Sequence, residues 1–404
     1  MRNNSTTRLR TSFARSLDQL VRWKARHGRS CNAFQLCGCL GVILASALAI
    51  ALTIYLDLSP VVTILIVLAA ILTFLGLVLV TKFISGKEQI IYYHHEIAVI
   101  LISSLLLLVL STPVLAYLDV TVLGIGTFLA FGRVGCFMVG CCHGRPYRWG
   151  VSYRQEHARA GFTPYYVGVR LFPIQLVESI WVLGTVIVGS CLVISGQQPG
   201  SVLAWYVVTY DLGRFWFEFM RGDPARPYLF GFSQPQWISV VLLWCVGVAE
   251  LEGILPLHWW HVAVALGLTI AMIAIARGRR FQRLPKFHLL HPRHVREIAE
   301  MIGPINQHVE SSRFRWTIFE IPTSTRCQIR GGCTSLGIRL SASTTRLGGE
   351  AIEHFAFSQV DAAMSAYAAR TLAQIITRLR RSESAGQLVR GNGGVFHLLI
   401  RHAA

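Results

Sequence analysis

Eight runs of apolar residues, each about as long as a lipid bilayer is thick, dominate this sequence. They occupy residues 38–57, 60–82, 96–117, 120–140, 173–195, 201–220, 237–254 and 258–276. A helix needs about 20 apolar residues to cross the hydrocarbon core, so each run predicts one transmembrane helix. Only Glu250, Glu252 and Pro256 separate the last two runs, so the expected number of helices is seven or eight. The predicted fold class is an all-α polytopic membrane protein.

The overall composition favours the same class. Of the 404 residues, 53% are hydrophobic and 14% are charged, whereas a soluble domain has about 25% charged residues. The net charge of +18 would suggest nucleic acid binding in a soluble protein, but no RNA-binding motif or zinc-finger spacing accompanies it. Basic ends of a membrane protein usually mark its cytoplasmic face and contact anionic lipid. We therefore expect the membrane, and not nucleic acid, as a partner.

Two polar regions flank the transmembrane domain, which we predict over residues 34–280. Residues 1–33 form a basic tail or a short surface helix with Asp18 as its one acidic residue. Residues 285–404 combine alternating stretches with a helical period at 360–381. This pattern predicts a small soluble α+β domain, to which the sequence assigns no role.

One arginine lies inside the fourth apolar run. A charged side chain in a membrane segment is costly and usually faces a protein interior or a wet cavity, so Arg133 marks a functional position. The planar guanidinium offers a fork of donors that matches phosphate or carboxylate. The alternative is that Arg133 only extends toward the headgroups. We favour a membrane-embedded site for an anionic lipid.

A second charged cluster ends the sixth run. Offsets of four and three residues place Arg214, Glu218 and Arg221 on one face of a helix. Glu218 would then hold both guanidiniums. The alternative is an ion-pair stripe that only locks the packing of helices.

Two groups of titratable residues complete the candidates. His94 and His95 could move a proton, because imidazole titrates near neutrality, and one of two adjacent histidines usually points away. Cysteines and a histidine cluster after the fourth run, at Cys136, Cys141, Cys142 and His143. Zinc sites usually show regular paired spacing, so we expect thiols that pack, or that lie near the reacting centre, and no metal.

With these clusters in order, the chain resembles the prolipoprotein diacylglyceryl transferase family. The matching segments are Gly132-Arg133-Val134-Gly135-Cys136-Phe137 with Gly144, Pro173-x-Gln175-Leu176-x-Glu178, Arg214-x-x-x-Glu218-Phe219-x-Arg221 with Asp223, and Gln236-x-x-Ser239. The resemblance covers about residues 90–250 and does not reach residues 285–404.

The resemblance implies a multi-pass transferase of the bacterial inner membrane that acts in lipoprotein biosynthesis. Its substrates would be phosphatidylglycerol, which donates a diacylglyceryl group, and a preprolipoprotein, whose lipobox cysteine thiol accepts it. Arg133 and Arg221 match the family's arginines and would hold the phosphate, and His95 best matches its essential histidine and would take the thiol proton. No cofactor is expected. The residues expected to bind substrate are Cys136, His143, Gly144, Arg145, Gln175, Glu178, Arg214 and Glu218.

Several positions depart from the family pattern. Cys136 stands where the motif has asparagine, Cys141 lies near an acidic position, and Phe172 replaces the histidine before Pro173. Thiols hydrogen-bond more weakly than amides and carboxylates, so part of the polar contact to substrate must be rebuilt. Two alternatives therefore stay open: a related membrane transferase with a different, possibly cytoplasmic, acceptor, and a non-catalytic membrane protein that binds anionic lipid.

The distribution of basic residues also conflicts with the orientation that the resemblance implies. Lysine and arginine occur before residue 34, in 82–87, 145–170 and 221–226, and after 277, whereas the opposite connections contain none. With eight helices, the positive-inside rule places the motif face, both termini and the C-terminal domain in the cytoplasm. Members of the family place the motif face outward.

Overall fold

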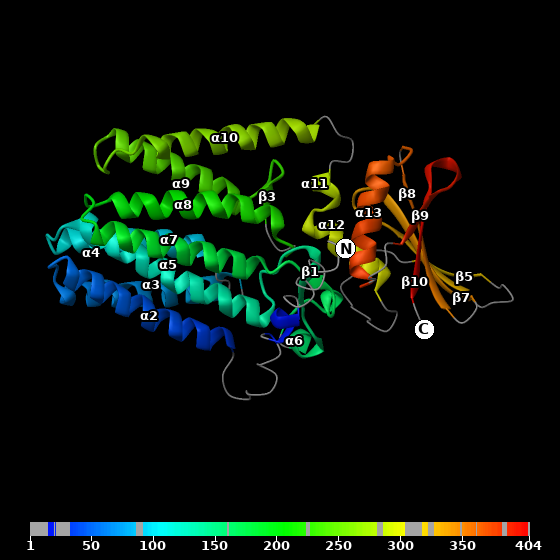
Figure 1. Cartoon of the computed structure of the whole chain (residues 1–404), viewed down its shortest axis with the longest axis horizontal. Helices are drawn as coiled ribbons and strands as arrows, with labels where there is room; N and C mark the ends of the chain where they lie inside the picture. The colour runs from blue at the N-terminus through cyan, green and yellow to red at the C-terminus, as the bar shows by residue number, and fades with distance from the viewer. Residues whose placement is uncertain are drawn as a thin grey trace, which may run out of the picture.

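The computed structural model shows a bundle of long helices with a mixed α+β domain at one end (Figure 1). It describes residues 15–19, 21, 33–85, 92–159, 161–223, 227–280, 286–303, 317–321, 327–347, 350–360, 362–381 and 386–402. Most of the basic tail predicted over 1–33, and part of the linker that follows Arg277, lie outside these residues.

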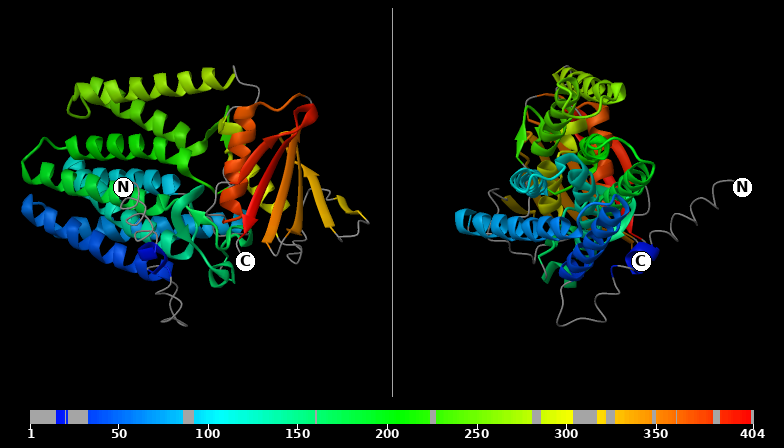
Figure 2. Two further views of the ribbon diagram at one scale, coloured as in Figure 1. Left: turned by 45° about the vertical axis from the view of Figure 1, so that its right-hand side comes forward. Right: turned by 90° about the vertical axis from the view of Figure 1, so that its left-hand side faces the viewer.

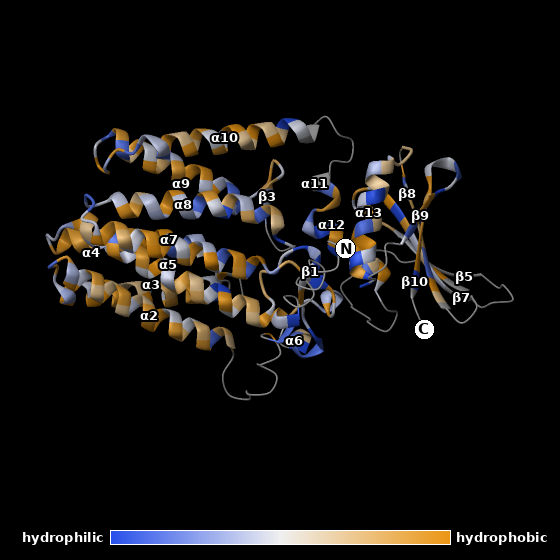
Figure 3. Ribbon diagram, in the orientation of Figure 1, coloured by the Kyte–Doolittle hydropathy of each residue, from blue (hydrophilic) through white to orange (hydrophobic). Residues whose placement is uncertain are grey.

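Within the described residues, eight long helices correspond to the eight apolar runs. They are α2 (Ala33–Tyr55), α3 (Pro60–Ser85), α4 (Tyr92–Val109), α5 (Val114–Val139), α7 (Ile174–Ile194), α8 (Ser201–Phe217), α9 (Gln234–Leu251) and α10 (Trp259–Arg280). Six of those described are long and apolar enough to cross a membrane by length and composition; the stretch counted for α4, Tyr93–Val109, and helix α8 are shorter. Hydrophobic residues line all of the long helices (Figure 3). The predicted class, a polytopic membrane protein with an α+β domain, is confirmed.

The apolar runs at 96–117 and 120–140 predict a connection at Tyr117 to Asp119, and this prediction is wrong. The chain turns at residues 110–113 instead, and both residues are buried in α5. The Asp119 carboxylate accepts hydrogen bonds from the backbone N–H groups of Gly200 and Leu203, each at 2.7 Å. These donors at the start of α8 have no partner within their own helix, so an acidic side chain in α5 satisfies them. Asp119 is therefore a buried cap and not a loop residue.

We expect Asp119→Asn to destabilise the bundle by about 1–3 kcal/mol, because the amide keeps only one accepting oxygen for two buried donors. Asp57→Asn is the matched control, since Asp57 is exposed in the α2–α3 turn. Thermal unfolding of the purified protein in detergent measures both. Equal midpoints for the two variants would contradict the capping role.

Helix α5 lies at the centre of the bundle, in contact with α2, α4, α7 and α8. Close packing there depends on small residues: a Cβ on Gly126 would lie 2.6 Å from the ring of Tyr206 and 2.7 Å from Val186. This central position places the polar C-terminal turns of α5 against α7 and α8.

A small cap covers the end of the bundle that carries the conspicuous motifs. Between α5 and α7 it contains β1 (Pro146–Ser152), α6 (Gln155–Arg159), the 3-10 turn η1 (Pro164–Tyr166) and β2 (Arg170–Leu171). After α8 follow η2 (Glu218–Met220) and the hairpin of β3 (Tyr228–Leu229) and β4 (Phe232–Ser233). Hydrophilic residues gather in this cap (Figure 3).

The C-terminal domain is one antiparallel sheet with helices on one face (Figure 2). Its strands are ordered β5-β6-β7-β8-β10-β9. The elements are α11 (Lys286–Leu289), α12 (Pro292–Ile302), β5 (Thr317–Ile321), β6 (Cys327–Cys333), β7 (Ile338–Leu347), β8 (Glu350–Gln359), α13 (Ala366–Leu379), β9 (Gln387–Arg390), η3 (Asn392–Gly394) and β10 (Phe396–His402).

The C-terminal domain packs directly on the cap. One hydrophobic cluster joins Phe162 and Tyr166 of the cap to the helices and sheet of this domain. Arg378 of α13 donates to the carbonyl of Pro146 at 3.3 Å, and Arg381 donates to that of Val167. Leu17, from a helical turn at residues 15–19, joins the same cluster. The N-terminal turn, the cap and the C-terminal domain therefore lie together at the motif end of the bundle.

His291 makes this contact sensitive to acid. Its ring lies 4.3 Å from that of Tyr228, and burial, with the nearby Arg293 and Arg145, lowers the pKa of His291 to about 4. The unfolded chain, with a histidine pKa of about 6.5, binds more protons in this range. The stability from neutral His291 is therefore complete above about pH 6.5 and is lost as pH falls through about 4.

We expect the thermal unfolding midpoint to fall between pH 6.5 and 4, and to fall less in His291→Gln, which cannot take up a proton. Differential scanning fluorimetry across this range measures both slopes. Parallel curves for the variant and the parent would assign the acid sensitivity to other groups.

Candidate functional site: a buried arginine–carboxylate cluster

Three arginines from different segments converge on one carboxylate. The Glu178 carboxylate, in the second turn of α7, lies 3.0 Å from Arg133 Nη2, 3.8 Å from Arg214 Nε and 3.8 Å from Arg221 Nη1. All four side chains are buried, and those of Glu178 and Arg221 are completely so. Arg133 is thus directed into the protein interior and not toward the headgroups, which favours the embedded-site interpretation over the alternative.

The predicted arrangement of the second cluster needs a correction. Helix α8 ends at Phe217, η2 tightens the next turn, and Arg221 follows in extended conformation with φ −68° and ψ 144°. Arg214 Nη1 pairs with Glu218 at 2.7 Å, as expected for residues four apart. Arg221 instead forms a two-pronged pair with Asp223, at 2.9 and 3.3 Å. Arg221 therefore lies beyond the helix, while Glu218 still acts electrostatically on both arginines. The carboxylate that reaches three guanidiniums is Glu178.

Backbone hydrogen bonds hold the segment around Gly144 against that of Arg221. The Gly144 N–H donates to the Phe172 carbonyl at 3.1 Å, and the Gly222 N–H donates to the His143 carbonyl at 2.9 Å. A Cβ on Gly144 would lie 2.3 Å from the Phe172 carbonyl oxygen. The approach of three backbones therefore requires glycine here, and it fixes where Arg221 stands.

Arg145 adds a fourth guanidinium at the edge of the cluster. Its Nε donates to the Arg221 carbonyl at 3.2 Å. Burial lowers the pKa of Arg145 to about 10, so the side chain still carries its charge near neutrality. The four guanidiniums of Arg133, Arg145, Arg214 and Arg221 exceed the three carboxylates of Glu178, Glu218 and Asp223 by one positive charge. Among these seven groups one guanidinium has no carboxylate to neutralise it, and an anionic ligand could pair with it, because buried charges are stable only when they are paired.

A second polar group lies beside this cluster, and sequence reasoning missed it. The Tyr93 hydroxyl donates to Asp211 at 2.6 Å and contacts the Ser239 hydroxyl at 2.8 Å, which joins α4, α8 and α9. The Tyr210 hydroxyl donates to Glu178 at 3.4 Å. The signal was available, because Tyr210 and Asp211 lie within an apolar run about one helical turn before Arg214.

The two adjacent histidines face different surroundings, as expected. His94 is exposed, with its Nε2 3.4 Å from the side-chain amide nitrogen of Gln234. His95 is buried, and its ring centroid lies 4.7 Å from that of Phe74 in α3. Phe74 in turn meets Phe128, five residues before Arg133 on α5. His95 is therefore the member of the pair that faces the bundle interior.

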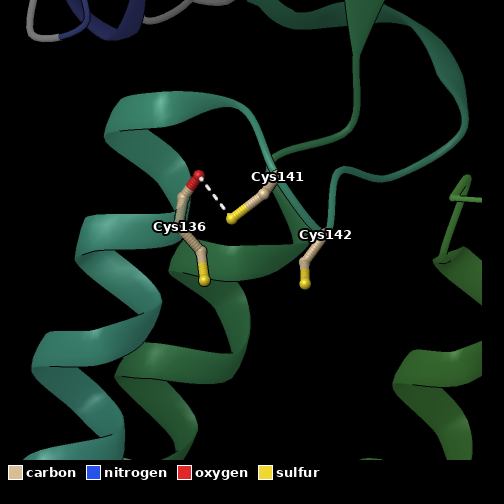
Figure 4. Close-up of side chains that lie close together, drawn as sticks. All are labelled: Cys136, Cys141 and Cys142. Carbon is tan, nitrogen blue, oxygen red and sulfur yellow. Dashed lines mark hydrogen bonds between the residues drawn. The ribbon is translucent and has the colours of Figure 1, made fainter. Parts of the chain in front are cut away.

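The three cysteines lie together at the end of α5 (Figure 4). Cys136, Cys141 and Cys142 place their sulfur atoms within 4.8 Å of one another, and Cys141 Sγ lies 3.8 Å from the Cys136 carbonyl. Three thiolates at this spacing could hold a thiophilic cation. The expectation of no metal stays a prediction.

His143 and Gln175 stabilise the turn that follows α5, each through different contacts. The His143 ring packs edge-on against Phe162 and Tyr166 of the cap, and burial lowers the pKa of His143. The Gln175 side chain donates to the Cys141 carbonyl at 2.8 Å. Both residues hold the turn that carries Gly144 and Arg145 beside the arginines.

The fold and the site define an integral membrane protein with a buried cluster of arginines and carboxylates inside its helical bundle. The chain matches the family model for prolipoprotein diacylglyceryl transferase over residues 36–251, more than half of its length, and it therefore belongs to this family. The resemblance drawn from the motifs is confirmed.

Several curated relatives carry the family's name. The chain is 32% identical over 127 residues to the phosphatidylglycerol–prolipoprotein diacylglyceryl transferase of Clostridium tetani. The matched segment covers 31% of this chain and 49% of the relative. It is 31% identical over 135 residues to transferase 2 of Clostridium perfringens, and this match covers 32% of the chain and 49% of the relative. The chain is 33% identical over 133 residues to the enzyme of Streptococcus agalactiae serotype V, and this match covers 31% of the chain and 48% of the relative. The chain spans about half the length of these relatives.

Proposed function

We propose that this protein transfers the diacylglyceryl group of phosphatidylglycerol to the lipobox cysteine thiol of a prolipoprotein in the bacterial inner membrane. The observation that carries the proposal is the convergence of Arg133, Arg214 and Arg221 on Glu178 inside the bundle. The names of the relatives and the family match support the same substrates.

The charges of the cluster suit the reaction. The thiolate sulfur forms a bond to the glyceryl carbon, and the bond from that carbon to the phosphate oxygen breaks. The phosphodiester carries one negative charge, and the departing glycerol phosphate gains a second. Arg133 and Arg221, as buried donors held in place by carboxylates, would stabilise the charge that develops on the leaving oxygen. Substrate binding is proposed for Arg145 and Arg214, for Cys136 in the last turn of α5, and for His143 and Gly144 in the turn that follows this helix.

The thiol must also lose its proton, and we assign that role to His95. The imidazole can accept a proton near neutrality, and its ring faces the bundle from the N-terminal turn of α4. His95 is named a catalytic residue on this basis together with the family resemblance.

Replacing the base separates an enzyme from a lipid binder. We expect His95→Ala to lower turnover by about 100- to 10,000-fold, the usual contribution of a general base, while binding of phosphatidylglycerol is retained. His94→Ala is the matched control, because this neighbour is exposed. The assay is mass spectrometry of a lipobox peptide incubated with the purified protein in phosphatidylglycerol nanodiscs. Equal rates for the two variants would remove His95 from the mechanism, and lipid binding without turnover in the parent would favour the non-catalytic alternative.

A second candidate differs only in the acceptor. The α+β domain contacts the cap through Arg378 and Arg381, so it lies at the motif end of the bundle. This position favours a domain that presents or selects the acceptor, and the basic residues of the same end favour a cytoplasmic one. Accordingly, we propose residues 34–280 as the transferase-like domain and 285–404 as an accessory domain. Protease digestion of a tag after Ala404 in intact cells would contradict the inward orientation.

A further inference from the structure

Three metal-ligand side chains meet at the end of the bundle remote from the arginines. Glu250 comes from the last turn of α9, His258 precedes α10, and His261 lies in its first turn (Figure 1). One ligand atom from each residue lies within 4.8 Å of the other two. The proposed transferase reaction uses none of these residues.

The spacing fits a small cation. Glu250 Oε1 lies 2.5 Å from His261 Nδ1 and 3.9 Å from His258 Nδ1. A zinc ion with bonds of about 2.0–2.1 Å in tetrahedral geometry separates its ligand atoms by about 3.3 Å. Both separations lie within about an ångström of that value, and the third, between the two imidazoles, is at most 4.8 Å. The shorter one is a hydrogen bond in this structure, and a cation would displace its proton.

The local chain path produces this arrangement. Gly253 reverses the chain after α9 with φ +72°, and the His258 carbonyl accepts from the His261 N–H at 2.9 Å. This turn brings both imidazoles to the side on which α9 ends. The His258 Nδ1 also lies 2.9 Å from the Pro256 carbonyl oxygen, so this ring would have to release that hydrogen bond to present Nδ1 to a cation.

Burial adds a second observation on the carboxylate. The side chains of Glu250 and His261 are almost completely buried, yet Glu250 Oε2 has no hydrogen-bond partner among the described residues, and neither has His261 Nε2, which lies on the side of the ring away from the Nδ1 that contacts Glu250. Buried polar atoms are nearly always satisfied, so these two are unusual. The His258 side chain is 33% exposed, which leaves a route for an ion from water.

We propose that Glu250, His258 and His261 bind a divalent cation of the zinc class, which joins the end of α9 to the start of α10. Two imidazoles and one carboxylate form a three-ligand set that zinc uses, with a fourth position left for water. Magnesium and calcium prefer all-oxygen sites and fit this set poorly.

The experiment uses the full chain, purified, treated with chelator and titrated with zinc chloride against a chromogenic chelator. We expect the parent to bind zinc at this site and His258→Gln to bind it at least about tenfold more weakly. Zinc should raise the thermal midpoint of the parent and leave that of the variant unchanged. His258 is partly exposed, so this substitution should not impair folding, and Glu250→Gln provides a second ligand variant.

Two controls assign the bound metal. His94→Gln removes an exposed histidine outside the cluster and should bind zinc like the parent. Cys141→Ser removes zinc that the three cysteines hold. Zinc that still binds to the Cys141→Ser variant, and that the His258→Gln variant no longer binds, therefore belongs to the new site. Zinc affinity unchanged in both His258→Gln and Glu250→Gln, or no zinc binding by the parent, would overturn the proposal.

Discussion

Arg221→Lys is expected to lower turnover by about 100- to 1,000-fold, the usual effect of removing one fixed donor from a developing negative charge. Lysine keeps the positive charge but lacks the planar fork. In the structure that fork serves Asp223 with Nε and Nη2 while Nη1 approaches Glu178. A single ammonium cannot hold both carboxylates in this geometry, so the charge that meets the phosphate would be displaced.

The effect should fall mainly on kcat, because the interaction strengthens as the phosphate gains charge. Arg154→Lys is the matched control, since Arg154 is exposed on the cap. Rates come from mass spectrometry of the lipidated peptide, and thermal midpoints show whether each variant is folded. A folded Arg221→Lys protein with the rate of the control would mean that charge alone suffices, and the proposed phosphate clamp would be wrong.

The sequence alone predicts much of this fold, because hydrophobic length is a local property. All eight apolar runs correspond to helices, and the alternating stretches after residue 285 correspond to part of a sheet. The error at Asp119 has a clear cause: an acidic residue between apolar stretches is typical of a loop, but its partners are 81 and 84 residues away at the start of α8. No window of local sequence contains that pairing.

The candidate site shows the same limit of local sequence patterns. Its members were named from their types and spacing, but helical spacing placed Arg221 on the face of α8 because it assumed that the helix continues to this residue. The helix ends at Phe217, and Glu178, from α7, takes the central position. The pairing of Tyr93 with Asp211 across 118 residues could likewise be found only in three dimensions. Local pattern thus predicts which residues are polar within the membrane, whereas packing decides which of them meet.

Glu178→Gln is expected to destabilise the protein by about 3–5 kcal/mol, the range for removing one partner from a buried ion pair. Glutamine keeps the shape of the side chain and a hydrogen-bonding oxygen but leaves three buried guanidiniums short of one negative charge. Glu156→Gln, at an exposed position in α6, is the control. Chemical unfolding monitored by circular dichroism in detergent gives the free energies.

A double-mutant cycle identifies the source of this loss. Adding Arg133→Gln to Glu178→Gln removes the arginine at 3.0 Å and restores the original excess of one positive charge. If charge imbalance causes the destabilisation, the double variant should be more stable than the sum of the two single changes predicts. Additive losses would show that Glu178 and Arg133 are not coupled through their charges. The proposal that a surplus positive charge receives the phosphate would then lose its basis, because that proposal assumes that Glu178 neutralises part of the charge of the arginine cluster.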